Sequence, residues 1–259
     1  MDSLTATLGL LPGDLVALVG AGDMTGVVRR LVTELRALGR RVVSTATVPM
    51  RPLTGVPDHP FLIEADPALR LARLPALLAA AGHVRVAAET LRADKIRGVD
   101  PTAIAPLRAL PGLDHLLVEA DGARHRALKA PAAHEPALPP DPTVVLICAD
   151  LAALGAPLDA LHVHRPELVQ ALTGLPAGAP LTGAAVATVL THPAGGLQGI
   201  PATARTWVVL TGLDRHTAWP AGELAAAILL TAPHLQGVIL LPSGAASAVT
   251  YAPFVVVRA

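Results

Sequence analysis

Short apolar runs alternate with longer segments of helical periodicity along this chain of 259 residues. Such alternation is typical of a mostly parallel sheet whose connecting helices cover its faces. It predicts a three-layer α/β fold, formed as a single domain over 1–259 with a helical insertion around 150–200. We expect helices over 25–38, 67–81, near 101–109, 165–172, 182–190 and 221–230. We expect strands over 15–19, 41–45, 83–88, 115–119, 144–149, 207–211, 237–241 and 254–257.

Prolines indicate where these elements are interrupted. Four prolines in 49–60 and five in 130–142 predict loops, the second of them extended and stiff. Pro67 suits the first turn of the helix predicted over 67–81. Pro75 lies inside that helix and should kink or split it, because proline lacks the amide that the helix interior requires.

The composition excludes several classes of function. Basic and acidic residues balance at 20 each and aromatic residues make up only 2%, so neither a basic patch nor a stacking platform for nucleic acid is expected. The mean hydropathy of +0.53 is high, yet every apolar run is far shorter than the ~18 residues of a membrane-spanning helix. The first residues lack the cationic start of a secretory signal, and the single cysteine, Cys148, excludes an intrachain disulfide. We therefore expect a cytoplasmic protein with no nucleic-acid or membrane partner.

A glycine-rich turn follows the first predicted strand. The sequence is Gly20-Ala21-Gly22-Asp23-Met24-Thr25, at the start of a predicted helix. Amides of such a turn and the positive end of the helix can bind phosphate, and the Thr25 hydroxyl could ligate Mg²⁺. However, a P-loop carries a lysine immediately before the Ser/Thr, and here that position is Met24. Arg29 and Arg30 are the nearby cations, and a tight turn without any ligand would explain the same residues.

Two carboxylates follow the strand predicted over 115–119. Glu119 and Asp121 end a strongly apolar run, and a carboxylate there is costly unless it meets a cation or hydrogen-bond donors. Next to a P-loop strand they would bind Mg²⁺ directly or through water, together with Thr25. We therefore expect the carboxylates and the glycine turn to share one pocket, because ligands bind at the carboxyl edge of such sheets. An ordinary surface turn with local ion pairs is the alternative.

Basic residues and histidines surround this point in the sequence. Arg124, Arg126 and Lys129 could neutralise the two acids or hold an anionic substrate, since arginine binds phosphate or carboxylate in a forked geometry. His134 and Glu135 are candidates for an acid/base pair or for metal ligands. The H-x-H of His162 and His164 is expected to be structural or exposed rather than a zinc site, because a zinc site needs further ligands at defined spacing.

These motifs together resemble the selenium-dependent molybdenum hydroxylase accessory proteins, the YqeC-like selenium cofactor biosynthesis family. The family pattern joins a strand and GAGGKTS to a central EADGAR…PLKAPA.HEP.IP block and an HRPE segment. The likeness spans roughly 8–241. The matching segments are EADGAR at 119–124, LKAPA at 128–132, HEP at 134–136, VHRPE at 163–167, TH at 191–192 and DKIRGV at 94–99.

The resemblance implies a P-loop NTPase-like fold and a role in maturation of molybdenum hydroxylases, with the client enzyme or its cofactor as partner. It also implies Mg²⁺ and NTP as possible cofactors, Asp121 and Lys129 as catalytic candidates, and a substrate or cofactor pocket. The residues of that pocket would be Gly122, Arg124, His134, Glu135, His164 and Arg165.

Three departures from the family pattern fall on nucleotide-handling positions. Asp23-Met24 replaces Gly-Lys, the threonine-rich strand end is Ser44-Thr-Ala-Thr47, and Thr211-Gly-Leu-Asp214 keeps only the aspartate of N-K-x-D. Three hypotheses follow. The chain is a nucleotide- or cofactor-binding accessory protein, a non-catalytic delivery module, or an NTPase that uses Lys95 or Lys129, the chain's two lysines, instead of the P-loop lysine.

Overall fold

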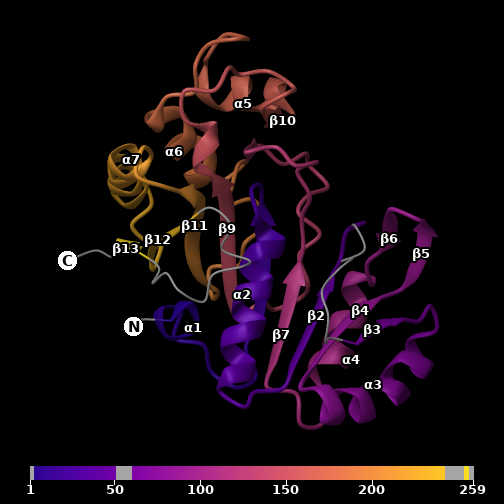
Figure 1. The fold of residues 1–259 in the computed structure, drawn as a ribbon. Coiled ribbons are helices and arrows are strands. Elements are labelled where there is room, and N and C mark those ends of the chain that lie inside the picture. Colours follow the sequence, from indigo (N-terminus) through magenta and orange to yellow (C-terminus); the bar gives the residue numbers. More distant parts are fainter. Residues whose placement is uncertain (1–2, 51–59, 243–253, 257–259) are drawn as a thin grey trace.

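A mostly parallel sheet runs through the computed structural model, which describes residues 3–50, 60–242 and 254–256 (Figure 1). Within these residues the sheet has nine strands in the order β13-β12-β11-β9-β1-β7-β2-β4-β3, and only β13 is antiparallel to its neighbour. The predicted α/β fold with a mostly parallel sheet is therefore confirmed. The strands are β1 (Leu15–Gly20), β2 (Val42–Ala46), β3 (Phe61–Ile63), β4 (His83–Ala87), β7 (His115–Glu119), β9 (Val144–Asp150), β11 (Arg205–Leu213), β12 (Gly237–Pro242) and β13 (Phe254–Val256).

The connections place β1 at the centre of the sheet. The chain leaves β1 for β2, returns to insert β7 between them, and then crosses to β9 on the other side of β1. Gly20 is in register with Cys148 of β9, and Glu119 is in register with Leu18 and Ala46. The carboxyl ends of β1, β7, β9 and β2 therefore meet at one edge, where open α/β sheets bind their ligands.

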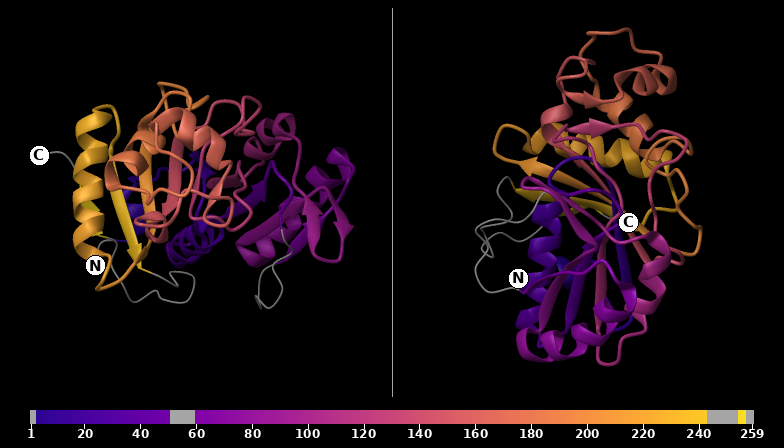
Figure 2. Two further views of the ribbon diagram at one scale, coloured as in Figure 1. Left: turned by 90° about the horizontal axis from the view of Figure 1, so that it is seen from above. Right: turned by 90° about the vertical axis from the view of Figure 1, so that its right-hand side faces the viewer.

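Helices cover both faces of the sheet, which gives the three layers that the sequence predicts (Figure 2). One face packs against α1 (Leu4–Thr7) and α2 (Met24–Ala37). The other packs against α3 (Pro67–Ala81), α4 (Ile104–Arg108), α5 (Pro166–Thr173), α6 (Gly183–Thr191) and α7 (Ala218–Thr231). No helix of the described residues is long and apolar enough to cross a membrane.

The helix α2 follows directly from its sequence pattern. Val28, Leu31 and Leu35 recur at helical spacing, and all three are buried against the sheet. Leu38, which continues the same spacing, is the C-terminal cap and is 64% exposed. The buried face therefore ends one turn earlier than the periodicity suggests.

The structure refines two helix predictions. The helix α3 continues through Pro75 without being split, although Pro75 removes one backbone hydrogen bond. Pro75 lies on the exposed side, while Leu74 and Leu78 are buried, so packing of the apolar face outweighs the missing bond. The helix expected near 101–109 is a 3-10 turn, Pro101–Ala103, followed by the single turn and a half of α4.

Two small ladders were not predicted from the sequence. One is the hairpin of β5 (Glu89–Arg92) and β6 (Lys95–Arg97), which stands at the side of the sheet (Figure 1). The other pairs β8 (Leu128–Lys129) in parallel with β10 (Val163–His164). The second ladder joins the central sequence block to the HRPE segment. It thus closes a segment of 33 intervening residues, 130–162, which includes β9.

Candidate functional site

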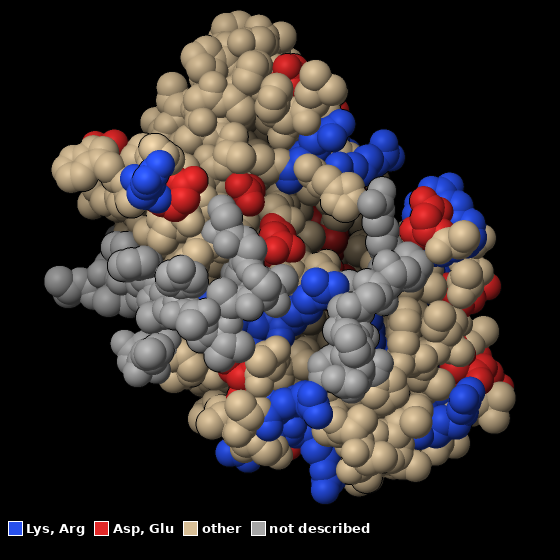
Figure 3. Space-filling model, viewed as in Figure 1, with Lys and Arg blue, Asp and Glu red and all other residues tan. Residues whose placement is uncertain are grey.

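The glycine turn and the two carboxylates lie side by side at the carboxyl edge of β1 and β7. The Gly20 amide donates to Asp121 Oδ2 at 3.1 Å, and the Thr25 hydroxyl donates to Glu119 Oε2 at 2.9 Å. The space-filling view shows a hollow on this face of the molecule, bordered by acidic and basic side chains (Figure 3). The structure therefore brings together the two segments that we expected to share a pocket.

Backbone amides of the turn already donate to protein oxygens. Besides the Gly20 amide, the Ala21 amide donates to the Cys148 carbonyl at 2.9 Å and the Gly22 amide donates to the Arg126 carbonyl at 3.3 Å. Gly20 has φ 96°, and a Cβ added to it would lie 2.4 Å from the Cys148 carbonyl oxygen. Glycine is required there because the turn lies directly against β9. These amides hold the turn to its neighbours rather than pointing at an open phosphate site.

Asp23 and Met24 both have structural roles at the start of α2. Asp23 is the N-cap residue, and its Oδ1 accepts the Gly26 amide at 2.8 Å. A carboxylate at that point satisfies the positive end of the helix, as a phosphate would in a P-loop. The Met24 side chain is buried among apolar residues of β1, β9 and α2. The position of the P-loop lysine is thus used for core packing.

Glu119 is held by a residue that sequence reasoning missed. Arg85 on β4 is buried and donates from Nη2 to Glu119 Oε1 at 3.1 Å. Burial lowers the pKa of Arg85, and the nearby Glu119 carboxylate opposes that shift. A signal was present in the sequence, since His83 and Arg85 alternate with valines in HVRVA. Such alternation directs two polar side chains to one face of a buried strand.

Lys129 is the centre of a buried ion-pair network. Its ammonium contacts Asp121 Oδ1, donates to the Gly122 carbonyl at 3.1 Å, and lies 2.9 Å from Glu135 Oε2. Arg165 completes the network through both oxygens of Glu135. The Lys129 side chain is 1% exposed and that of Asp121 is 4% exposed. The β8–β10 ladder pairs Lys129 with His164, the residue before Arg165. Backbone pairing therefore brings the two cations of the network, Lys129 and Arg165, close together.

The network changes the acidity of its members. Burial raises the pKa of Asp121, although Lys129 opposes this shift. Burial would also raise the pKa of Glu135, but hydrogen bonds from Arg165 and Lys129 outweigh it and lower that pKa to about 2. Burial lowers the pKa of His164, and the charges of Arg165 and Lys129 lower it further. The site therefore holds ionised Glu135 and neutral His164 at pH 7.

Around the network, other predicted residues face outward. Arg124 is exposed and makes no hydrogen bond or ion pair with the residues that the structure describes. Its charge nevertheless reaches His164, whose pKa it helps to lower. Arg124, His125 and Arg165 all have left-handed backbones, with φ of 50°, 61° and 62°. Such conformations in residues other than glycine often mark functional loops.

Three other predicted residues, Gly122, Arg126 and His134, lie close to this network in the sequence. The Gly122 amide donates to Asp121 Oδ1 at 2.8 Å. Arg126 donates to the Ala160 carbonyl at 2.7 Å and so ties the central block to the segment before β10. His134 is exposed in the proline-rich loop beside Glu135.

The residues predicted to bind Mg²⁺ do not fit the ion as they are arranged. Both oxygens of Glu119 accept hydrogen bonds, from Arg85 and Thr25. Both oxygens of Asp121 also accept hydrogen bonds, from Gly20, Gly122 and Lys129. Among the described residues, no three His, Cys, Asp or Glu side chains form a group that could hold a metal. Magnesium ligation by Thr25, Glu119 and Asp121 stays a prediction that requires these donors to move.

Lys95 and Asp214 belong to other parts of the fold. Lys95 belongs to the β5–β6 hairpin. The Asp214 carboxylate accepts the amides of His216 and Thr217 in the turn before α7, so it acts as a local cap. Thr211, from the same segment, does reach the glycine turn, because its Oγ1 lies 3.5 Å from the Asp23 amide nitrogen.

Comparisons with known proteins match the part of the sequence that forms this site. A sequence model of the family described as YqeC protein matches residues 16–167, which include the glycine turn, both carboxylates, Lys129 and Arg165. The uncharacterized protein YqeC of Escherichia coli (strain K12) is 33% identical over 196 residues, covering 75% of this chain and 74% of that protein.

Proposed function

Since the chain belongs to the YqeC family, we propose that it is an accessory protein in the maturation of molybdenum hydroxylases, including selenium-dependent ones. In this role it binds an anionic cofactor or nucleotide at the carboxyl edge of β1 and β7. It holds or delivers that ligand without hydrolysing NTP. Its partners are the client hydroxylase and the cofactor.

The non-catalytic assignment rests on one observation: the groups that would bind phosphate in a P-loop here contact the protein itself. The turn amides bind protein oxygens, the Asp23 carboxylate caps α2, and Met24 is buried in the core. Phosphoryl transfer depends on cations and amides that are free to stabilise the transferred group. This supports a binding role over hydrolysis at the glycine turn.

The ligand-facing part of the site is the exposed basic rim next to Lys129. Arg124 is exposed and has no hydrogen-bond or ion-pair partner among the described residues, and His164 lies partly exposed near it. A guanidinium grips phosphate or carboxylate through two parallel hydrogen bonds. The paired carboxylates behind the rim are already neutralised by Lys129 and Arg165, so they do not repel an anion strongly.

The alternative of an NTPase that uses another lysine has less support. Lys129 is 1% exposed and is held by two carboxylates, so it would have to leave both before it could reach a phosphate. Lys95 has freer surroundings in the β5–β6 hairpin, but the hairpin stands at the side of the sheet (Figure 1).

Phosphate release from ATP and GTP separates binding from hydrolysis. We expect purified protein with Mg²⁺ to release phosphate no faster than the buffer, while an anionic ligand raises its melting temperature. Turnover that is magnesium-dependent and lost in Lys95→Ala would favour the NTPase hypothesis. The double variant Asp23→Gly with Met24→Lys should gain ATP affinity, because it removes the capping carboxylate and restores the phosphate-binding lysine.

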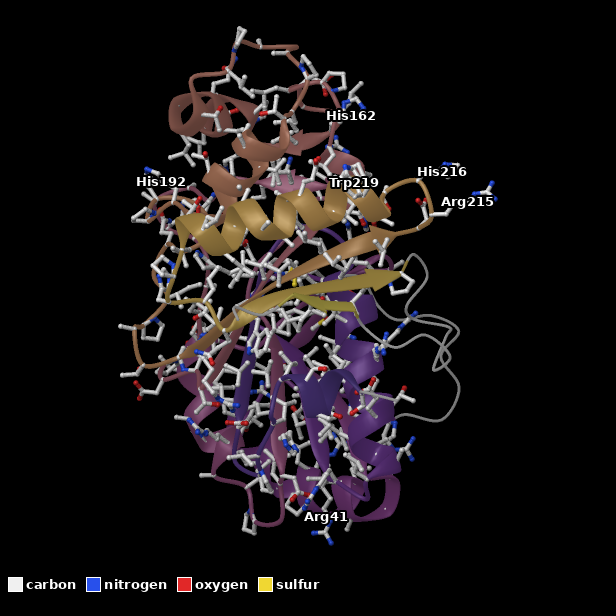
Figure 4. All side chains as sticks on the ribbon, turned by 90° about the vertical axis from the view of Figure 1, so that its left-hand side faces the viewer. Arg41, His162, His192, Arg215, His216 and Trp219 are labelled. Atoms are coloured by element: carbon white, nitrogen blue, oxygen red, sulfur yellow. The ribbon has the colours of Figure 1, made fainter. Side chains whose placement is uncertain are left out.

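Complementation tests the biological role. In cells that lack this chain, we expect molybdenum hydroxylase activity to fall and the wild-type chain to restore it. Arg124→Ala should restore it poorly, whereas Arg215→Ala, a matched loss of an exposed arginine, should restore it fully. Figure 4 shows Arg215 projecting away from the body of the protein, at the connection between β11 and α7. Unchanged hydroxylase activity without the chain would contradict the proposed role.

A further inference from the structure

A second cation cluster lies between α2 and β4, away from Lys129. Arg85 extends from β4, is 5% exposed, and uses Nη2 to contact Glu119 Oε1. The same Nη2 lies 2.8 Å from the Met50 thioether, which is only a weak acceptor. Its Nε is buried and has no hydrogen-bond partner in the part of the chain that the structure describes. Arg85 is therefore a buried guanidinium whose donors exceed the strong acceptors around it.

Arg29 on α2 is the second cation of the cluster. Thr25 reaches Glu119 from α2, and Arg29 is four residues further along, so both side chains lie on the same side of the helix. Arg29 Nε is also buried, and it too lacks a partner among the described residues. The charge of Arg29 is near enough to contribute to lowering the pKa of Arg85, after the larger effect of burial.

The charges of this cluster do not balance. Arg85 pairs with Glu119, whose two oxygens already accept from Arg85 and Thr25. Arg29 makes no ion pair with the described residues, so the cluster carries one more positive charge than negative. Buried donors without acceptors cost free energy, and in folded proteins they generally indicate a bound water or ion. A positive excess together with unpaired N–H groups selects an anion over a neutral water.

We propose that Arg29 and Arg85 bind a single small tetrahedral oxyanion, such as phosphate or sulfate, between α2 and β4. The anion would accept from both Nε groups and balance the charge that Glu119 leaves unpaired. The anion must be small because Arg85 is buried and leaves little room beside its guanidinium. This site is separate from the rim around Arg124, and it does not depend on the proposed accessory role.

Thermal unfolding with inorganic phosphate tests the site directly. Melting temperatures are measured in chloride and in phosphate or sulfate at matched ionic strength and pH, for the wild type and for Arg29→Gln. We expect phosphate at tenfold its Kd to raise the wild-type melting temperature by roughly 3 °C. Most of this rise should be lost in Arg29→Gln. The matched control Arg215→Gln removes the same charge elsewhere and should keep the rise.

Two further arms assign the effect to this site. Arg124→Gln should keep the phosphate response, because it alters only the exposed rim. If Arg124→Gln lost the response while Arg29→Gln kept it, the proposal would be overturned. Equal responses in wild type and Arg29→Gln would also overturn it. A rise with ATP but none with inorganic phosphate would contradict a site for a small free oxyanion. Because Arg85→Gln removes the partner of Glu119 and can impair folding, Arg29→Gln is the deciding variant.

Discussion

Two groups of buried charges meet the end of β7, and they differ in balance. In the first group, Lys129 and Arg165 face Asp121 and Glu135, so two cations meet two carboxylates. In the second group, Arg85 pairs with Glu119, while Arg29 makes no ion pair with the residues that the structure describes. The first group satisfies itself and fixes the loops around it, whereas the second retains unused donors. The comparison teaches that the residues resembling a catalytic centre can be structural, while a less conspicuous cluster keeps binding capacity.

The largest expected effect is that of Lys129→Ala on the free energy of unfolding. The substitution leaves the Asp121 carboxylate buried without its cation, and breaking such a pair costs about 3–5 kcal/mol of unfolding free energy. Urea denaturation measures the loss. The chain's other lysine gives a matched control, since Lys95→Ala in the β5–β6 hairpin should change stability by less than about 0.5 kcal/mol. A loss below about 1 kcal/mol in Lys129→Ala would show that the balanced network is not structural.

A smaller loss is expected for Arg85→Gln. Glu119 then keeps the Thr25 hydroxyl and the nearby charge of Arg29, so we expect about 2 kcal/mol rather than the full cost of an isolated buried charge. The double variant with Arg29→Gln should lose more than the sum of the single variants, because each arginine compensates for the other. Additive losses would contradict the view that both arginines act on one carboxylate.

The sequence predicted the elements whose apolar pattern is long enough to be decisive. Strands β1, β7 and β9 and helix α2 are continuous apolar or periodic runs, and their packing follows the pattern. The sequence also indicated that the glycine turn meets Glu119 and Asp121, since parallel strands share their carboxyl edge. These predictions succeed because burial leaves a local signal in the sequence, as an apolar run or a helical repeat.

Features that depend on contacts across the chain were not predictable. The β8–β10 ladder has two residues in each strand and pairs positions that are 35 residues apart in the chain. Arg85 pairs with a residue 34 positions away, and no spacing rule links β4 to β7. Pro75 does not split α3, and the burial of Leu74 and Leu78 beside it depends on contacts with the sheet rather than on the local sequence.

A third prediction concerns the capping carboxylate that replaces a phosphate. Asp23→Ala should lower the unfolding free energy by about 1 kcal/mol, since the Gly26 amide loses its acceptor. Asp66, which caps α3 in the same way, offers a comparison of similar size in Asp66→Ala. If inorganic phosphate restored the stability of Asp23→Ala and not that of Asp66→Ala, the turn would be shown to retain anion affinity once its own carboxylate is removed.

The smallest effect is a pH dependence of the balanced group. The pKa of Glu135 is about 2 in the folded protein, below its ordinary value of 4.5. Its stabilisation is therefore fully present above pH 4.5 and is lost as the pH falls towards 2. The stability difference between wild type and Glu135→Gln should shrink over that range, by less than about 1 kcal/mol because the side chain is only partly buried. Urea unfolding at pH 6 and pH 3 measures this; a constant difference would contradict it.

The two-residue ladder between β8 and β10 has a consequence for how the chain tolerates changes of length. Both ends of the intervening segment are anchored by backbone hydrogen bonds and by the Arg165–Glu135 contact. Insertions at the exposed positions 140–141, before β9 begins at Val144, should therefore leave the charged centre in register, since loop closure costs grow slowly with length. A single deletion between Asp121 and Lys129 should not be tolerated, because it would rotate the lysine out of the ladder and away from its carboxylates.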